Sequence, residues 1–156
     1  MMYFTHLVFA LLTGIAVDKY LFHFPNAYVA ISLILFGALL PDIDKRGSYI
    51  GKKVGVIGDA TSMLFKHRGF FHSIWVILIG YGTVYFFFFR YLPYAQFVAV
   101  GYVSHLISDS LTVQGVSYLY PFYKDKLRVH GFIKTNTVLE SAFCLILGII
   151  IWYLVF

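Results

Sequence analysis

One histidine and one aspartate lie a single helical turn apart within an apolar stretch of this 156-residue sequence. His105 and Asp109 are four residues apart, so on a helix both side chains project from the same face. An imidazole nitrogen and a carboxylate oxygen placed in this way can bind the same metal ion. The alternative interpretation is a hydrogen bond that serves only helix packing.

Two short motifs supply further side chains of the same kinds. In HRGFFHS, His67 and His72 straddle a predicted loop-to-helix junction, and a bend at Gly69 would direct both rings to one cluster. In PDID the two carboxylates alternate, so we expect Asp42 to bind metal and Asp44 to orient a ligand or the reacting water. Helix capping or loop solvation is the alternative for both aspartates.

His6 and Glu140 lie near the starts of the first and the last apolar segment. Ionisable residues inside membrane segments are functional by default, which favours a role as ligands. His6 could instead sit at the level of the lipid headgroups, and Glu140 could simply interact with the dipole of its helix. His23 is predicted to lie on the opposite side, and His130 lies in a loop as a weaker candidate.

The residue types define the metals that such a cluster would bind. Cys144 is the only cysteine, so the site has no multiple thiolate ligands. Imidazole and carboxylate ligands suit zinc first, with manganese and iron as alternatives, and several carboxylates would allow two or more ions. The predicted ligands are His6, Asp42, His67, His72, His105, Asp109 and Glu140.

The composition indicates which elements must position these side chains. The chain is 60% hydrophobic and 21% aromatic, whereas only 12% of its residues are charged. A soluble domain of this size could not bury so much apolar surface. A second core would need roughly 100 residues of its own, so we predict one membrane domain over residues 1–156.

Five apolar segments are recognisable, at about residues 3–17, 27–40, 71–89, 94–111 and 138–156. Three of them approach the roughly 20 residues that cross a bilayer, and the first two are shorter. Backbone polar groups in lipid must be satisfied within each segment, and the alternation of a membrane β-strand is absent. We therefore predict an all-α polytopic membrane bundle of about five transmembrane helices.

The basic residues predict the orientation. Ten of the 12 Lys and Arg residues fall in the loops 41–70 and 112–137. Because positive loops stay in the cytoplasm, we expect both loops and the N-terminus there and the C-terminus outside. The basic residues do not form an amphipathic stripe, so the net charge of +5 indicates membrane topology and no nucleic acid partner.

This topology places the seven predicted ligands and Asp44 at the cytoplasmic ends of the helices. The order of the motifs, from a threonine–histidine pair near the start through PDID and HRGFFHS to GYVSHLISDSLTVQG and a following YPF, resembles the YdjM-like family of membrane-bound metal-dependent hydrolases. The resemblance covers nearly the whole chain. Phe71 stands where the family usually has threonine. The family is considered similar to zinc-dependent phospholipase C, which implies a metal-dependent hydrolase.

The leading hypothesis is hydrolysis of a phosphoester of a lipid or lipid-linked substrate at the cytoplasmic face, where the headgroups lie. Asp44 would orient or deprotonate the attacking water, and Arg68 would stabilise charge on the phosphoryl oxygens. The expected partners are membrane lipids and this lipid phosphate. A metal or proton transporter is one alternative, although such sites usually lie near the bilayer midplane. A non-enzymatic membrane protein with a structural metal site is the other.

Overall fold

The computed structural model describes residues 1–44, 70–123, 125–127 and 131–156 of the chain. Five α-helices lie in this part, namely α1 (Tyr3–Tyr20), α2 (Ala27–Leu39), α5 (Ile74–Phe87), α6 (Leu92–Ser110) and α7 (Val138–Val155). Three short 3-10 helices accompany them: η1 (Leu40–Asp44), η2 (Phe70–His72) and η3 (Phe89–Tyr91). Among the described residues there are isolated β-bridges but no strands, so the all-α prediction is confirmed.

The helix bounds follow the apolar segments, with one clear difference. The third segment was expected to be helical over residues 71–89, but α5 covers only Ile74–Phe87. The residues before it turn in η2, and Ser73 takes an extended backbone conformation immediately before the helix. At 1.5 Å per residue, 14 residues reach only about 21 Å. Within the described ranges, only Val138–Val155 is both long and apolar enough to cross a membrane, with a mean hydropathy of 2.3.

Helices α1, α2 and α6 pack together as the core of the molecule, and two glycines bring the backbones of α2 and α6 into contact. A Cβ atom added at Gly101 would lie 1.8 Å from the carbonyl oxygen of Ile34, and one added at Gly37 would lie 2.1 Å from that of Val98. Small residues allow such close approach between helices in membranes. Any side chain larger than hydrogen would force α2 and α6 apart.

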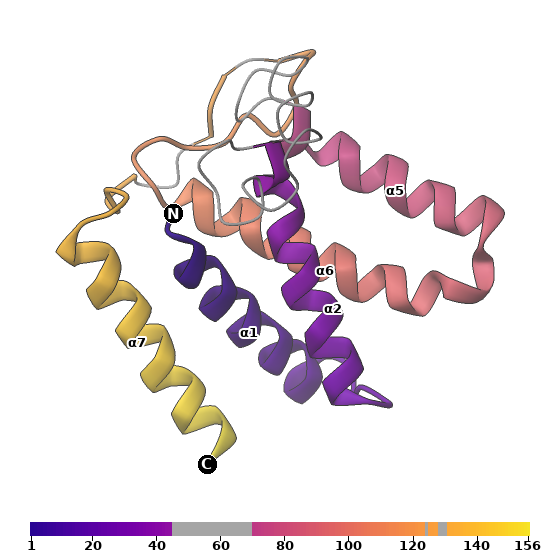
Figure 1. Ribbon diagram of the computed structural model, residues 1–156, viewed down its shortest axis with the longest axis horizontal. Coiled ribbons are helices and arrows are strands. Elements are labelled where there is room, and N and C mark those ends of the chain that lie inside the picture. Colours follow the sequence, from indigo (N-terminus) through magenta and orange to yellow (C-terminus); the bar gives the residue numbers. More distant parts are fainter. Residues whose placement is uncertain (45–69, 124, 128–130) are drawn as a thin grey trace.

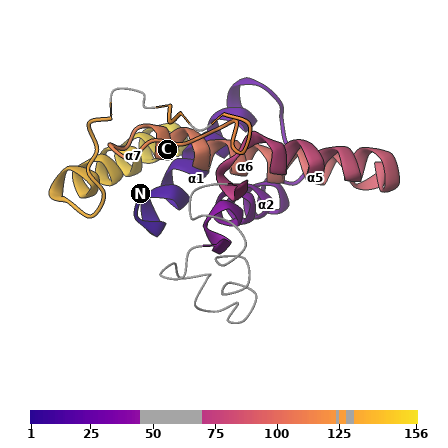
Figure 2. The same cartoon turned by 90° about the horizontal axis from the view of Figure 1, so that it is seen from above.

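The outer helices expose much more apolar surface. Figure 1 shows α7 beside α1, while α5 and the connected end of α6 form a hairpin that projects from the core. Figure 2 shows the same hairpin extending to one side. No residue of α5 is buried, and Phe86 and Phe87 are both 78% exposed. Exposed apolar surface on this scale is expected where lipid or another protein covers a helix.

The helix ends that carry or adjoin the predicted ligands lie on the same side of the molecule. The starts of α1, α5 and α7 and the ends of α2 and α6 all lie in the upper part of Figure 1. The hydrogen bond from the Ile74 amide to the Tyr118 carbonyl, at 2.9 Å, joins the start of α5 to the segment that follows α6. The fold therefore gathers polar residues from distant parts of the sequence at one end.

Candidate metal centre

Five of the seven predicted ligands come together at this end. They lie on α1, η1, η2 and α6 and are His6, Asp42, His72, His105 and Asp109, called the cluster below. Two triads within the cluster have ligand atoms that all lie within 4.8 Å of one another. One triad is His6, Asp42 and His105, and the other is His72, His105 and Asp109. Because His105 belongs to both, it is the centre of the arrangement.

The contacts of His105 determine which of its nitrogens faces the cluster. Its Nδ1 lies 2.7 Å from the carbonyl oxygen of Ala38, which can only accept, so Nδ1 carries the proton and donates. The close approach of α2 to α6 makes this bond possible. In the neutral ring the lone pair is then on Nε2. This nitrogen is buried and has no hydrogen-bond partner among the described residues, as expected of a metal ligand.

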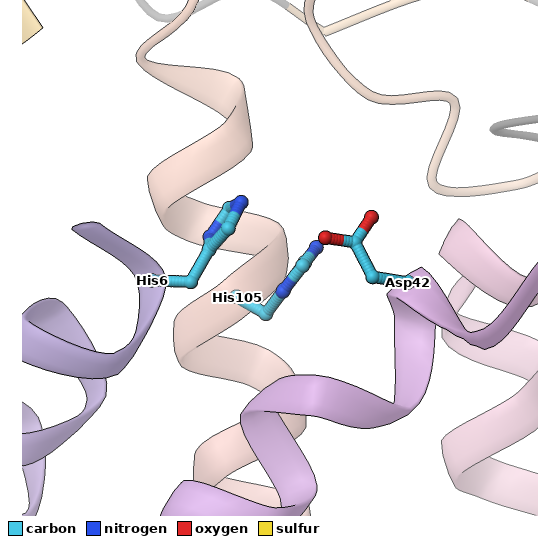
Figure 3. Close-up of side chains that lie close together, drawn as sticks. All are labelled: His6, Asp42 and His105. Atoms are coloured by element: carbon cyan, nitrogen blue, oxygen red, sulfur yellow. The ribbon is translucent and has the colours of Figure 1, made fainter. Parts of the chain in front are cut away.

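His6 presents the same nitrogen through a different contact. The Ser108 hydroxyl donates to the carbonyl oxygen of His105 at 2.8 Å, so its oxygen accepts from Nδ1 of His6, also at 2.8 Å. The lone pair of neutral His6 is therefore again on Nε2. The two rings are stacked, with centroids 3.8 Å apart and an interplanar angle of 11°. In Figure 3, His105 lies between His6 and the carboxylate of Asp42.

The carboxylates lie just beyond these nitrogens. Asp109 Oδ1 is 3.5 Å from Nε2 of His6, and Oδ2 is 3.9 Å from Nε2 of His105 and 3.8 Å from that of His72. Two ligands that are each about 2.1 Å from a tetrahedral zinc ion lie about 3.4 Å apart. The observed separations exceed this value only slightly. Imidazole lone pairs and carboxylate oxygens at these separations are a donor set that a divalent cation binds, so the residues fit a divalent metal.

Access to the cluster is from the Asp42 side. The Asp42 side chain is 15% exposed, whereas those of the four other members are at most 2% exposed. Nε2 of His105 can bind only one ion, because its Nδ1 is committed to Ala38. The two triads therefore cannot both use His105 at the same time.

Glu140 belongs to neither triad. Its carboxylate is fully buried and accepts hydrogen bonds from the backbone amides of Met2 and, at 2.7 Å, Asn136. These contacts join the first turn of α7 to the start of α1. Next to them, the α-ammonium group of Met1 donates to Asp109 at 2.6 Å. The contacts of Glu140 thus place the first turn of α1, which carries His6, against α7.

The remaining predicted site residues cannot be placed. His67 and Arg68 lie outside the described residues, and so does the side chain of Asp44, although its backbone ends η1. Their predicted roles stay predictions.

The sequence interpretation overlooked Ser108, which orients His6. Its signal was visible, because Ser108 lies three residues after His105 on the same face of an apolar helix. The role of the Ala38 carbonyl had no such signal, since every residue has a backbone carbonyl. Tyr102, which donates to the carbonyl of Phe71 at 2.6 Å and so connects α6 to η2, was also missed.

The fold and the cluster together define a class: an all-helical protein with an apolar outer surface and a buried histidine–carboxylate centre at one end. The chain belongs to the YdjM inner membrane protein family, whose model matches residues 1–156. The family resemblance expected from the motifs is thus confirmed, and membership places the chain in a membrane.

Two relatives illustrate the match. The uncharacterized protein YvsG of Bacillus subtilis (strain 168) is 35% identical over 108 residues, which is 67% of this chain and 64% of that protein. Inner membrane protein YdjM of Escherichia coli (strain K12) is 36% identical over 91 residues, 53% of this chain and 44% of that protein. The matches thus span less than two thirds of these relatives. No solved structure matches the chain.

Proposed function

We propose that the protein is a metal-dependent hydrolase that cleaves a phosphoester of a lipid or lipid-linked substrate at the cytoplasmic face of the membrane. One observation carries the proposal. The two stacked histidines direct the lone pairs of their Nε2 atoms at the buried carboxylate of Asp109, and hydrogen bonds from both Nδ1 atoms hold them in that orientation. Metal centres use such bonds to orient their imidazole ligands.

Cluster residues would hold the ion or ions, with zinc as the first candidate. A bound divalent cation would lower the pKa of water and offset negative charge on the phosphoryl oxygens. In the proposed reaction, the oxygen of a water molecule forms a bond to phosphorus while the ester P–O bond breaks. Asp44 takes a proton from the water and returns it to the leaving oxygen. Arg68 binds the phosphoryl oxygens through its guanidinium group.

The proposal includes five membrane-crossing helices with the cluster at the headgroup level. Helices α1 and α6 have 18 and 19 residues, whereas α2 and α5 have 13 and 14 and would need their flanking residues or a thinner bilayer. The excess of basic residues in the two long loops supports a cytoplasmic location for the cluster. In a Cys144→Ser background, His23→Cys should react with an impermeant thiol reagent added from outside.

Elemental analysis of the detergent-purified protein tests the metal centre. The wild-type protein should contain at least one equivalent of zinc, manganese or iron. His105→Ala and Asp109→Asn should lose the metal together with hydrolysis of p-nitrophenyl phosphate and phosphatidic acid. His23→Ala, at the opposite end of α1, is the matched control and should keep both.

The outcomes separate the proposal from its alternatives. Hydrolysis that persists in folded His105→Ala protein would overturn the metal-dependent mechanism. Metal that is retained without hydrolysis of any phosphoester would favour a structural site. Ion flux in sealed vesicles that depends on His105 would favour transport.

A further inference from the structure

An apolar groove of about 290 Å³ lies between α5 and α6. Every residue that lines it is aliphatic, aromatic or glycine, including Val76, Gly80, Val84 and Ala95. Pockets for small molecules usually measure about 300–1,000 Å³ and contain a few polar groups that orient the ligand. This groove is at the lower end of that size range and consists almost entirely of hydrocarbon. It is therefore suited to a narrow apolar chain.

Three residues that line the groove lie close in sequence to members of the cluster. Leu40 lines the groove at the start of η1, two residues before Asp42. Val76 lines it on α5, four residues after His72, and Tyr102 lines it one turn before His105 on α6. One end of the groove therefore lies beside the cluster.

Tyr102 forms the boundary between the groove and the cluster. It is only 1% exposed, and its ring lines the groove while its hydroxyl group donates to the carbonyl oxygens of Phe71 and Ser73. The Phe71 bond measures 2.6 Å and the Ser73 bond 3.2 Å. The polar contacts are therefore on the η2 side, towards His72, and the apolar surface is on the α5 side. A ligand that spans both parts must be polar at one end and apolar along its length.

We propose that the groove holds one hydrocarbon chain of the lipid substrate, so that its phosphate reaches the cluster. This inference rests on the proposed function and adds the part of the substrate that is recognised. Helix α5 has no buried residue and forms one wall of the groove, so chains of the surrounding membrane can enter from the side. A water-soluble phosphoester would leave this surface unused.

Two glycines of α5 provide a matched pair of variants. A Cβ atom added at Gly80, which lines the groove, meets nothing within 4 Å, and the same is true at Gly82, which does not line it. The Cβ atom of Gly80→Leu therefore has room, and the rest of its side chain should occupy part of the groove. Gly82→Leu adds the same side chain to the same helix outside the groove and controls for helix propensity and folding.

The kinetic probe is phosphatidic acid with chains of sixteen or four carbons in mixed micelles. For Gly80→Leu, KM for the long-chain form should rise about tenfold, as expected when about two methylene groups are excluded from an apolar site. KM for the short-chain form and kcat should change less than about twofold, and Gly82→Leu should match the wild type in both. Equal changes for both chain lengths, or no change, would overturn the groove assignment.

Photolabelling tests occupancy without turnover. Phosphatidic acid with a diazirine in its acyl chain, incorporated into phosphatidylcholine vesicles, should label α5 and α6 residues of the groove. Gly80→Leu should reduce this labelling severalfold, and His105→Ala should retain it. Labelling without hydrolysis in the wild-type protein would refute the proposed enzyme but support the groove. Labelling that is the same in Gly80→Leu would show ordinary contact with bulk lipid and overturn the inference.

Discussion

Glycine serves opposite purposes in the α2–α6 pair and in α5. At Gly37 and Gly101 the neighbouring backbone is so close that a Cβ atom would overlap a carbonyl group, whereas at Gly80 and Gly82 it would meet empty space. The first pair brings two helices into contact and allows Ala38 to orient His105. The second pair leaves room beside a helix that has no buried residue. The contrast separates a closely packed region that positions the candidate ligands from an exposed apolar region.

The largest effect should come from adding one methyl group at the close contact. Gly101→Ala would place Cβ 1.8 Å from the Ile34 carbonyl oxygen, so α2 and α6 must separate. We expect a loss of about 3 kcal/mol or more in the free energy of unfolding, at the upper end of the cost of overpacking, with loss of the metal. Thermal unfolding in detergent and elemental analysis would measure both.

The same substitution in α5 is the control. Gly80→Ala meets no atom within 4 Å, so it should be neutral or stabilise the helix by up to about 1 kcal/mol. If the two alanine variants were equally stable, the distinction between the two regions would be wrong.

A smaller effect should follow from removal of the hydroxyl that orients His6. Ser108→Ala removes the acceptor for Nδ1 of His6 and frees the ring to rotate. Loss of such an outer contact typically weakens metal binding about 10- to 100-fold. Competition with a chelating dye would measure the affinity.

Ser104→Ala is the matched control for Ser108→Ala, because Ser104 is buried one turn earlier on α6 and bonds to the Gly101 carbonyl. It should leave the affinity for metal unchanged. Equal affinities in the two variants would mean that Ser108 does not orient His6 for metal binding.

Glu140 tests whether a residue that joins α7 to the start of α1 also binds metal, as the sequence predicted. In Glu140→Gln one oxygen that accepts a backbone amide becomes an amide group that cannot accept. We expect a loss of about 1–3 kcal/mol in the free energy of unfolding, the cost of a buried unsatisfied amide. The affinity for metal should change much less than in Asp109→Asn. Denaturation curves would measure the free energy of unfolding, and metal titrations would measure the affinity. Loss of the metal from well-folded Glu140→Gln protein would instead favour Glu140 as a ligand.

The smallest effect is expected at the end of the molecule away from the cluster. Asn26 caps α2 by accepting from the Val29 amide at 3.2 Å. Asn26→Ala should cost about 1 kcal/mol of stability and leave metal content unchanged. Thermal unfolding followed by circular dichroism would measure the stability, and elemental analysis would measure the metal content. Loss of metal would mean that the two ends of α2 are coupled.

The sequence by itself determined the helices and predicted that the candidate ligands gather at one end of the molecule, as five of them do. Hydropathy and the single-turn spacing of His105 and Asp109 are local properties, so they can be read without knowledge of long-range contacts. The bounds of α1, α2, α6 and α7 accordingly lie within a few residues of the apolar segments. The start of α5 was missed, because a short 3-10 turn has no hydrophobic period that would distinguish it from a helix.

Only the tertiary structure decided which atoms meet. Met2 and Glu140 are 138 residues apart in the sequence. Other contacts that orient the cluster are also distant in sequence, and no local pattern encodes such pairs. The protonated nitrogen of His105 depends on a backbone carbonyl that two glycines bring within 2.7 Å. Residue types and spacing thus predict a set of ligands. The approach of separate helices determines which ligand atoms face each other, because burial and hydrogen-bond geometry exist only after the helices have packed.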